Sequence, residues 1–135
     1  MYKRQGLGGA LLRERVVAHE AKKFVVLVTP EKLVDKLGER TPIPIEVIPF
    51  ARAAVMRNLQ KVGGRAVVRA SGGKDYLTDN GNLIFDTHFA PIEDPAATDA
   101  AIRRVPGVVD TGIFLGMADV VLVGERGAVR ELKRH

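Results

Sequence analysis

The first forty residues change from a helical to a strand pattern of hydrophobic positions. Residues 10–23 place apolar side chains three and four positions apart, which predicts an amphipathic helix that ends in a charged cluster. The uninterrupted, β-branched run FVVLV at 24–28 is typical of a strand that is buried on both faces in a parallel sheet. Thr29 as N-cap and Pro30 then predict a short helix that Gly38 can end. We expect these elements to form a piece of an α/β sheet.

The pattern changes at residues 41–50, where prolines accompany alternating apolar residues. This segment predicts a short strand at the edge of a sheet, with Pro42 and Pro44 at its entry. The next elements follow in order: a helix over 51–64 with an apolar stripe through Ala51, Val55, Leu59 and Val62, a strand over 65–70, a hairpin over 76–89 with its turn at Asn80–Gly81, a helix that begins at Asp94, and a strand over 108–114. Residues 42–115 therefore have the order β-α-β-β-α-β of a ferredoxin-like sandwich.

The end of the chain has the same pattern of continuous apolar residues as its beginning. Residues 118–124 form a second fully apolar run, ADVVLVG, and a turn and a terminal helix are predicted after it. Because this run matches residues 24–28 in character, we expect the chain to leave an α/β sheet, build a small α+β unit, and return to the same sheet.

Composition narrows the classes of protein to which the chain can belong. Its 135 residues are 46% hydrophobic and 27% charged, which is ordinary for a globular protein, and no run approaches the roughly 18 apolar residues of a membrane span. The absence of cysteine excludes disulfides and thiolate metal sites and fits a cytoplasmic location. The net charge of +5 is spread along a chain with only two Tyr and five Phe, so we expect no nucleic-acid partner. A small anionic ligand would suit this charge equally well.

Glu14 is the most unusual residue of the first predicted helix. At 100° per residue it falls in the middle of the face formed by Ala10, Leu11, Val17, Ala18 and Ala21. The helix N-terminus favours the carboxylate, whereas burial favours the acid, and a base that moves a proton needs such a balance. The alternative is an ion pair with a Lys or Arg of another element, and the pattern alone favours this structural alternative.

Two further features are candidates for binding an anion. Gly6, Gly8 and Gly9 precede the helix, so backbone N–H groups of this turn can approach an anion or an oxyanion closely, although a plain turn explains them equally well. Lys32 follows a predicted parallel strand, at the carboxyl end where open α/β sheets bind ligands. An exposed lysine is otherwise only solvated.

Other polar residues have simpler explanations. Asp86 and His88 lie two positions apart on one face of a predicted strand and could bind a metal ion. The three histidines of the chain are scattered, so we expect no metal site. The polar stretch TDNGN at 78–82 is explained by turn chemistry.

Six segments of the chain, in this order, resemble the type A ribose-5-phosphate isomerase family. They are GGALLRE (8–14), KLVDKLG (32–38), PIPIEVIPFARAAV (42–55), TDNGNLIFD (78–86), VPGVVDTGIF (105–114) and ADVVLVG (118–124). The resemblance covers residues 6–129. It implies the C-terminal part of a Rossmann-like parallel-sheet domain (residues 1–41 and 116–135) with an inserted ferredoxin-like α+β subdomain (residues 42–115).

The family interconverts ribose 5-phosphate and ribulose 5-phosphate through an enediolate, without a metal or another cofactor. For this chain the resemblance implies that Glu14 accepts the proton and that Gly6, Leu7 and Gly8 contact the sugar through their backbone amides. It also implies that Lys32 helps to hold the substrate. The chain departs from the family at Gln5, where the family has a lysine. The positive charge that would stabilise the enediolate is therefore missing at this position. Leu7 stands where the family has a glycine, which leaves backbone contacts possible.

The resemblance covers only the C-terminal portion of the family. A first strand and helix, a Ser/Thr-rich phosphate loop, and an Asp-Gly-Ala-Asp-Glu segment with two substrate-facing aspartates have no counterpart here. The residues MYKRQ do not resemble the family, and we expect them to be foreign sequence at the start of a truncated reading frame. We therefore expect the chain alone to be poorly stable or inactive.

Two alternatives to an enzyme remain open, together with the number of subunits. A non-catalytic sugar-phosphate-binding module would bind the sugar without turnover. A structural or interaction protein would use the α+β unit as an oligomer contact. By family we expect a homodimer or homotetramer.

Overall fold

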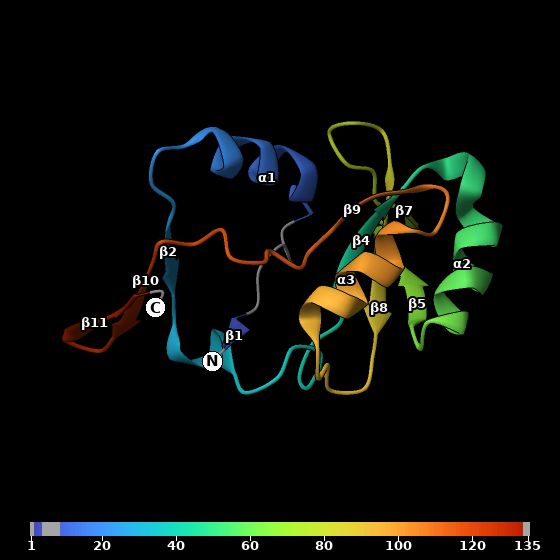
Figure 1. The fold of residues 1–135 in the computed structure, drawn as a ribbon. Helices are drawn as coiled ribbons and strands as arrows, with labels where there is room; N and C mark the ends of the chain where they lie inside the picture. The colour runs from blue at the N-terminus through green and yellow to red at the C-terminus, as the bar shows by residue number, and fades with distance from the viewer. Residues whose placement is uncertain (1, 4–8, 134–135) are drawn as a thin grey trace.

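The computed structural model describes residues 2–3 and 9–133 and shows two parts that lie side by side (Figure 1). One part contains helix α1 and a three-stranded sheet, and the other contains a four-stranded sheet with helices α2 and α3. None of the helices in these residues is long and apolar enough to cross a membrane.

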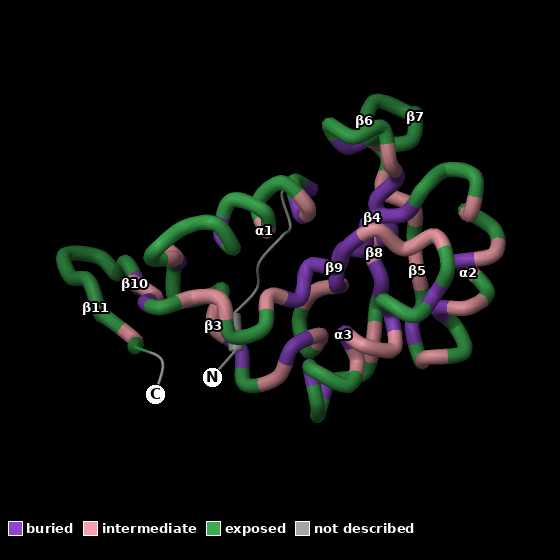
Figure 2. Tube along the Cα trace, turned by 45° about the horizontal axis from the view of Figure 1, so that its top comes forward, coloured by how far each residue is buried: buried purple, intermediate pink, exposed green. Residues whose placement is uncertain are grey.

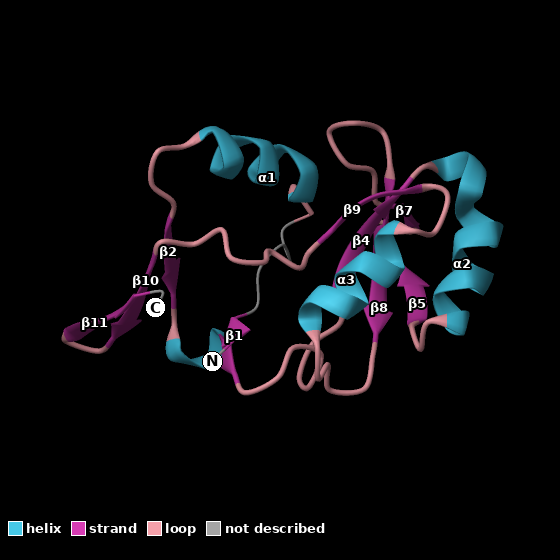
Figure 3. Ribbon diagram, viewed as in Figure 1, coloured by secondary structure: helices cyan, strands magenta, loops and turns pink. Residues whose placement is uncertain are grey.

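The four-stranded sheet is antiparallel throughout and has the strand order β5-β8-β4-β9. Along the chain its elements are β4 (Ile43–Val47), α2 (Arg52–Lys61), β5 (Arg65–Val68), β8 (Leu83–His88), α3 (Pro95–Arg103) and β9 (Val108–Thr111) (Figure 3). A 3-10 turn, Pro49–Ala51, precedes α2, and a small hairpin of β6 (Ala70–Ser71) and β7 (Lys74–Asp75) lies between β5 and β8. Apart from this hairpin, the elements follow the predicted order β-α-β-β-α-β.

The hydrophobic core lies between this sheet and its helices, where Figure 2 shows most of the buried residues. Alternate residues of the central strands point to one face and meet the apolar stripes of both helices. The cluster includes Ile45, Val47, Leu83 and Phe85 from the strands and Val55, Leu59 and Ile102 from the helices. Val55 and Leu59 are fully buried, with Ala51 and Val62 packed beside them, so the predicted stripe is confirmed. Asp94 caps α3 by accepting a hydrogen bond from the backbone N–H of Ala97 at 3.1 Å, as predicted.

Strand β4 is central, which corrects the prediction of an edge strand. It pairs with β8 on one side and β9 on the other. Pro44 is accommodated because β9 ends at Thr111, and at the next position the N–H of Gly112 donates to the Pro44 carbonyl at 2.7 Å. A Cβ on Gly112 would lie 2.6 Å from Cγ of the proline ring, so the glycine leaves room for that ring.

The second sheet has the order β11-β10-β2, formed by β2 (Val25–Val28), β10 (Val120–Glu125) and β11 (Ala128–Lys133). Strands β2 and β10 are parallel, which confirms the predicted return of the chain to a parallel sheet. The prediction that β2 is buried on both faces is wrong, because the side chains of Val25 and Leu27 are 42% and 73% exposed. Among the described residues β2 pairs only with β10. The face of β2 that carries the side chains of Val25 and Leu27 is exposed to solvent.

Two predicted helices are replaced by other structure. After a single 3-10 turn (Pro30–Lys32), the backbone becomes extended at β3 (Leu33–Val34), which pairs with β1 (Tyr2–Lys3). The predicted terminal helix is strand β11, which pairs with β10 through a two-residue turn at Arg126–Gly127. Gly127 has a φ of +78°, a left-handed conformation that glycine adopts without strain, and the free edge of β10 supplies the pairing partner.

The hairpin predicted over 76–89 is present only in part. Its turn is confirmed, since the N–H of Gly81 donates to the carbonyl of Thr78 at 2.9 Å and Gly81 has a φ of +75°. Its first arm is reduced to a single bridge between Leu77 and Leu83. Strand β8 pairs instead with β5 and β4, in a sheet whose apolar face, with Leu83 and Phe85, is covered by the helices.

Candidate functional site around helix α1

Helix α1 (Leu11–Glu20) turns a different face inward from the one predicted. Leu11 and Ala18 are buried, but Val17 is 70% exposed and Glu14 is also exposed. The inward face runs through Leu11, Arg15 and Ala18, at positions i, i+4 and i+7. The prediction that Glu14 lies at the centre of a buried apolar face is therefore wrong, because an arginine occupies the position that faces the rest of the molecule.

Glu14 nevertheless lies in an unusual environment for an exposed carboxyl group. Its backbone N–H closes the first helical turn by donating to the carbonyl of Ala10 at 3.0 Å. Partial removal from water raises the pKa of Glu14 above its ordinary value, and the positive charge of Arg15 opposes this rise. A carboxyl group with a raised pKa is a better proton acceptor once it is ionised.

The glycine-rich turn before α1 ends against the four-stranded unit. Gly9 has a φ of +87°, and a Cβ at this position would lie 2.9 Å from the Tyr76 hydroxyl oxygen and 3.2 Å from a guanidinium nitrogen of Arg69. The backbone conformation therefore favours a glycine, and a larger residue would also have to displace the ends of the Tyr76 and Arg69 side chains. The predicted substrate-binding residues Gly6, Leu7 and Gly8, together with Gln5, lie outside the described residues.

The arginine next to Gly9, Arg69, forms an ion pair with Asp86. Arg69 donates to the two carboxylate oxygens of Asp86 at 2.9 Å and 2.7 Å, and its guanidinium lies 5.7 Å from the centre of the Tyr76 ring. Asp86, weighed above as a metal ligand with His88, is therefore engaged by a cation. The part of the chain that the structure describes holds no cluster of three or more His, Cys, Asp or Glu side chains that could bind a metal ion.

The turn at 78–82 contacts the first turn of α1, which sequence reasoning did not anticipate. The Thr78 hydroxyl accepts the backbone N–H groups of Asn80 and Asn82 at 3.2 Å and 3.1 Å, as turn chemistry predicts. In addition, Arg13 donates to the Asn80 side-chain oxygen at 3.2 Å and pairs with Asp79 at 4.0 Å. The turn therefore lies next to the helix that carries Glu14.

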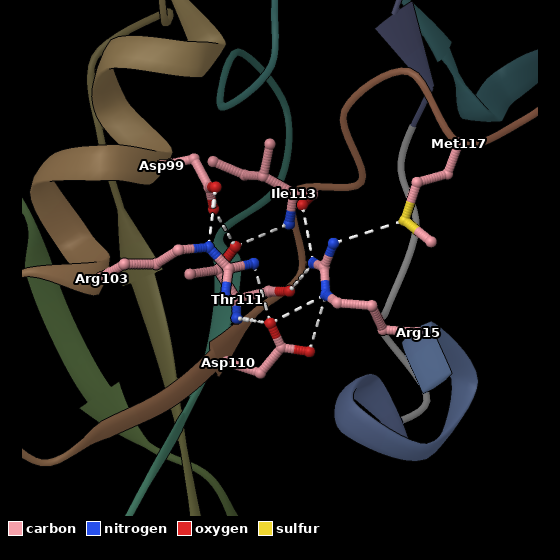
Figure 4. A network of polar contacts seen from close by, with 7 residues as sticks. All are labelled: Arg15, Asp99, Arg103, Asp110, Thr111, Ile113 and Met117. Carbon is pink, nitrogen blue, oxygen red and sulfur yellow. Dashed lines mark hydrogen bonds and ion pairs between the residues drawn. The ribbon is translucent and has the colours of Figure 1, made fainter. Parts of the chain in front are cut away.

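Sequence reasoning also missed a buried ionic network between α1, β9 and α3 (Figure 4). Asp110 is 1% exposed and accepts hydrogen bonds at 2.9 Å from Nε of Arg15 and from the guanidinium of Arg103. Arg103 also donates to Asp99 at 2.8 Å, and the Thr111 hydroxyl donates to the same carboxylate at 2.6 Å. The sequence holds two weak signals for this network: Arg15 lies between Leu11 and Ala18 in the helical pattern, and Asp99 and Arg103 are four positions apart in a predicted helix.

Lys32 lies in the 3-10 turn at the carboxyl end of β2, the position expected for it. It lines an open hollow of about 370 Å³ together with Leu27, Val28, Thr29, Leu122, Gly124 and Val129. This hollow is located where the parallel strands β2 and β10 end. Within the described part of the chain, no hydrogen bond or ion pair joins Lys32 to Glu14.

Comparison with known proteins identifies the family. Residues 3–127 match the family model of ribose 5-phosphate isomerase A (phosphoriboisomerase A). The match begins at Lys3, so the prediction that residues 1–5 do not resemble the family is wrong for residues 3–5. The chain is 45% identical over 128 residues to "Ribose-5-phosphate isomerase A" of Gloeobacter violaceus, covering 95% of this chain and 56% of the relative. It is 50% identical over 121 residues to the protein of that name from Gluconobacter oxydans, covering 88% and 52%. The chain thus spans about half the length of these curated relatives.

Solved structures agree in fold, a mixed α/β arrangement with a parallel-sheet region. Ribose 5-phosphate isomerase A of Methanocaldococcus jannaschii matches with a TM-score of 0.89 and 46% identity, over 97% of this chain and 58% of that one. A D-ribose-5-phosphate isomerase in complex with phospho-erythronic acid matches with a TM-score of 0.91 and 41% identity, over 97% and 58%. The chain belongs to the ribose 5-phosphate isomerase A family.

Proposed function

We propose that this chain carries the proton-transferring part of an isomerase that interconverts ribose 5-phosphate and ribulose 5-phosphate in the non-oxidative pentose phosphate pathway. The observation that carries the proposal is Glu14, whose carboxyl group has a raised pKa in the first turn of a helix directly after a glycine-rich turn. Two findings support it: the relatives bear the name of this enzyme, and a related structure holds a phosphorylated sugar acid.

In the proposed reaction Glu14 acts as the base for one proton. Its carboxylate takes the proton from C2 of the open-chain aldose, and the electrons of that C–H bond form a C1–C2 double bond while the carbonyl oxygen O1 becomes an oxyanion. The acid then returns the proton to C1, and the proton of O2 moves to O1. These steps give the ketose, need no cofactor, and leave Glu14 ionised again.

The other predicted site residues take supporting roles in the proposal. The backbone amides of Gly6, Leu7 and Gly8 face the oxyanion as hydrogen-bond donors. Lys32 supplies a positive charge to the substrate from the carboxyl end of β2. The antiparallel order β5-β8-β4-β9 supports the assignment of residues 42–115 as a ferredoxin-like insertion within a Rossmann-like domain.

Gln5 favours a second candidate, a module that binds the sugar phosphate without isomerising it. The family has a lysine at this position, and a glutamine cannot supply a charge to an enediolate. The exposed face of β2 also favours this second candidate. A solvent-exposed pocket stabilises a charged intermediate less than a pocket from which water is excluded.

The test is loss of the C2 deuterium from ribose 5-phosphate deuterated at C2, followed by NMR. This exchange reports proton abstraction even when net turnover is slow. Net turnover by the chain alone should be weak or undetectable, but we expect measurable exchange with the unaltered chain. Glu14→Gln should lose at least about 100-fold of this exchange, with unchanged sugar-phosphate affinity. Glu20→Gln, at the exposed end of the same helix, is the control and should exchange normally.

The two candidates give different results in this assay. Binding of ribose 5-phosphate without deuterium exchange would identify the non-catalytic module. Absence of binding would contradict both candidates.

A further inference from the structure

Arg15 joins helix α1 to strand β9 and to the residues that follow it (Figure 4). Its Nε lies 2.9 Å from both carboxylate oxygens of Asp110, and a second guanidinium nitrogen donates to the carbonyls of Thr111 and Ile113 at 2.8 Å. The flat face of the guanidinium lies 4.2 Å from the centre of the Phe114 ring. Arg15 thus makes several hydrogen bonds and a cation–π contact with the Phe114 ring at the same time. Together these contacts fix both the position and the orientation of its guanidinium group.

The acceptor for Arg15 is itself held rigidly. Asp110 is buried, and besides Arg15 it accepts hydrogen bonds from Arg103 and from the backbone N–H of Thr111, each at 2.9 Å. Arg103 is in turn held by Asp99 of α3. An arginine bound to this carboxylate is therefore tied to the framework of the four-stranded unit rather than to a mobile surface group.

Apolar packing holds α1 only weakly by comparison. Leu11 and Ala18 are buried, but Val16 and Val17 face solvent. A helix of 10 residues is marginal in water unless tertiary contacts support it. The contacts of Arg15 therefore account for much of what fixes the rotation of α1 about its own axis.

We propose that Arg15 is a positioning residue: its contacts with Asp110 and with residues 111–114 set the rotation and placement of α1, and thereby the direction of the Glu14 carboxylate. Neighbouring residues of a helix point about 100° apart, so fixing Arg15 also fixes Glu14. The role assigned to Glu14 rests on the proposed function, whereas the hold of Arg15 on α1 does not depend on it.

Arg15→Lys tests this inference in the 135-residue chain, because it keeps the charge but removes the fork and the flat face. Arg13→Lys is the matched control, since Arg13 flanks Glu14 on the other side and makes only exposed contacts. Both changes replace one positive charge by another, so the formal charges around α1 stay the same. The measurements are amide hydrogen exchange of α1 and α2 and the NMR titration of the Glu14 carboxyl carbon.

We expect Arg15→Lys to speed amide exchange in α1 about tenfold or more while exchange in α2 stays within about twofold. The pKa of Glu14 should fall toward its ordinary value, because a loosened helix returns the carboxyl group to water. Arg13→Lys should change neither measurement. Unchanged exchange in α1, or equal acceleration in α1 and α2, would overturn the inference.

Phe114→Leu provides a second variant that leaves every charge in place, should Arg15→Lys fail to fold. It removes the ring beneath the guanidinium, so a smaller acceleration confined to α1 is expected and its absence would count against the inference. Titration of the unaltered chain with ribose 5-phosphate tests the proposed function separately. A chain that binds no ribose 5-phosphate would contradict that function, while the exchange data would still decide whether Arg15 holds α1.

Discussion

Glu14 connects the chemistry of the site to the stability of the chain. Its pKa is raised above the ordinary value of 4.5, so the folded chain binds this proton more tightly than the unfolded chain does. The stabilisation that follows is complete below that value and is lost as the pH rises through the raised pKa. Glu14→Gln cannot titrate, so its free energy of unfolding should rise relative to the unaltered chain between about pH 4 and about pH 7.

Urea unfolding of both proteins at the two pH values measures this difference. A difference that is the same at both pH values would contradict the raised pKa of Glu14 in the folded chain.

Asp110 should be among the residues to which stability is most sensitive. Asp110→Ala leaves Arg15 and Arg103 without their shared buried partner, and breaking a buried pair in this way costs about 3–5 kcal/mol. Asp79→Ala removes an exposed carboxylate that also pairs with an arginine of α1, and it should cost at most about 1 kcal/mol. Urea unfolding gives both values, and equal losses would contradict the importance assigned to burial.

The sequence predicted some residues of this site and missed others for a physical reason. Glu14 and Lys32 were singled out because a carboxylate after a glycine-rich turn and a lysine after a parallel strand are local signals, and their roles stay predictions. Arg15 was missed because its meaning depends on Asp110, which is 95 positions away in the sequence. The ion pair with Asp110 turns the Arg15 face of α1 inward. Glu14 is therefore exposed, and the prediction that it is buried is wrong.

At the scale of elements, the contact between Pro44 and Gly112 allows a proline in a central strand. In Gly112→Ala the new Cβ would lie 2.6 Å and 2.7 Å from two ring carbons of Pro44, which must shift. Overpacking of this kind costs about 1–3 kcal/mol in the free energy of unfolding. Gly124→Ala in β10 is the control, because the nearest atom would be 3.9 Å away, and it should change stability by less than about 0.5 kcal/mol.

A second substitution separates the ring contact from other effects of Gly112→Ala. If the clash with the ring is the cause, adding Pro44→Ala should recover part of the loss measured by urea unfolding. A double variant that is destabilised by the full sum of both changes would rule out this cause.

Helices α2 and α3 were predicted correctly because their signals are local. The stripe through Val55 and Leu59 and the cap at Asp94 can be identified within a few residues. By contrast, β4 was placed at an edge because its central position depends on pairing with β8 and β9, which lie far away in the sequence. Strand β11 was taken for a helix although its partner β10 is its neighbour in the sequence. The residues of β11 are mostly exposed, so their own preferences are too weak to oppose pairing with β10.

At the scale of the whole molecule, the three-stranded sheet leaves an apolar side uncovered. Leu27 is 73% exposed there, and it lines the same hollow as Val129, which is 70% exposed. Exposed apolar patches promote self-association. Leu27→Lys should therefore reduce the concentration-dependent mass measured by light scattering and change the free energy of unfolding by less than about 1 kcal/mol.

Val17→Lys is the control for added charge, because Val17 is equally exposed but lies on helix α1. It should affect self-association less than Leu27→Lys. Equal effects of the two variants would show that net charge, and not the open side of the sheet, governs association.

The parallel pairing of β2 with β10 also sets an order of events in folding. Val25 pairs with Val120, which lies 95 residues later in the sequence, whereas the strands of the four-stranded sheet and the hairpin of β10 with β11 connect nearer residues. Closing so long a loop costs entropy that is recovered only when the intervening chain is already compact. We therefore expect β2 to join its sheet last, so that a folding chain forms the four-stranded unit while β2 still lacks β10 as its partner.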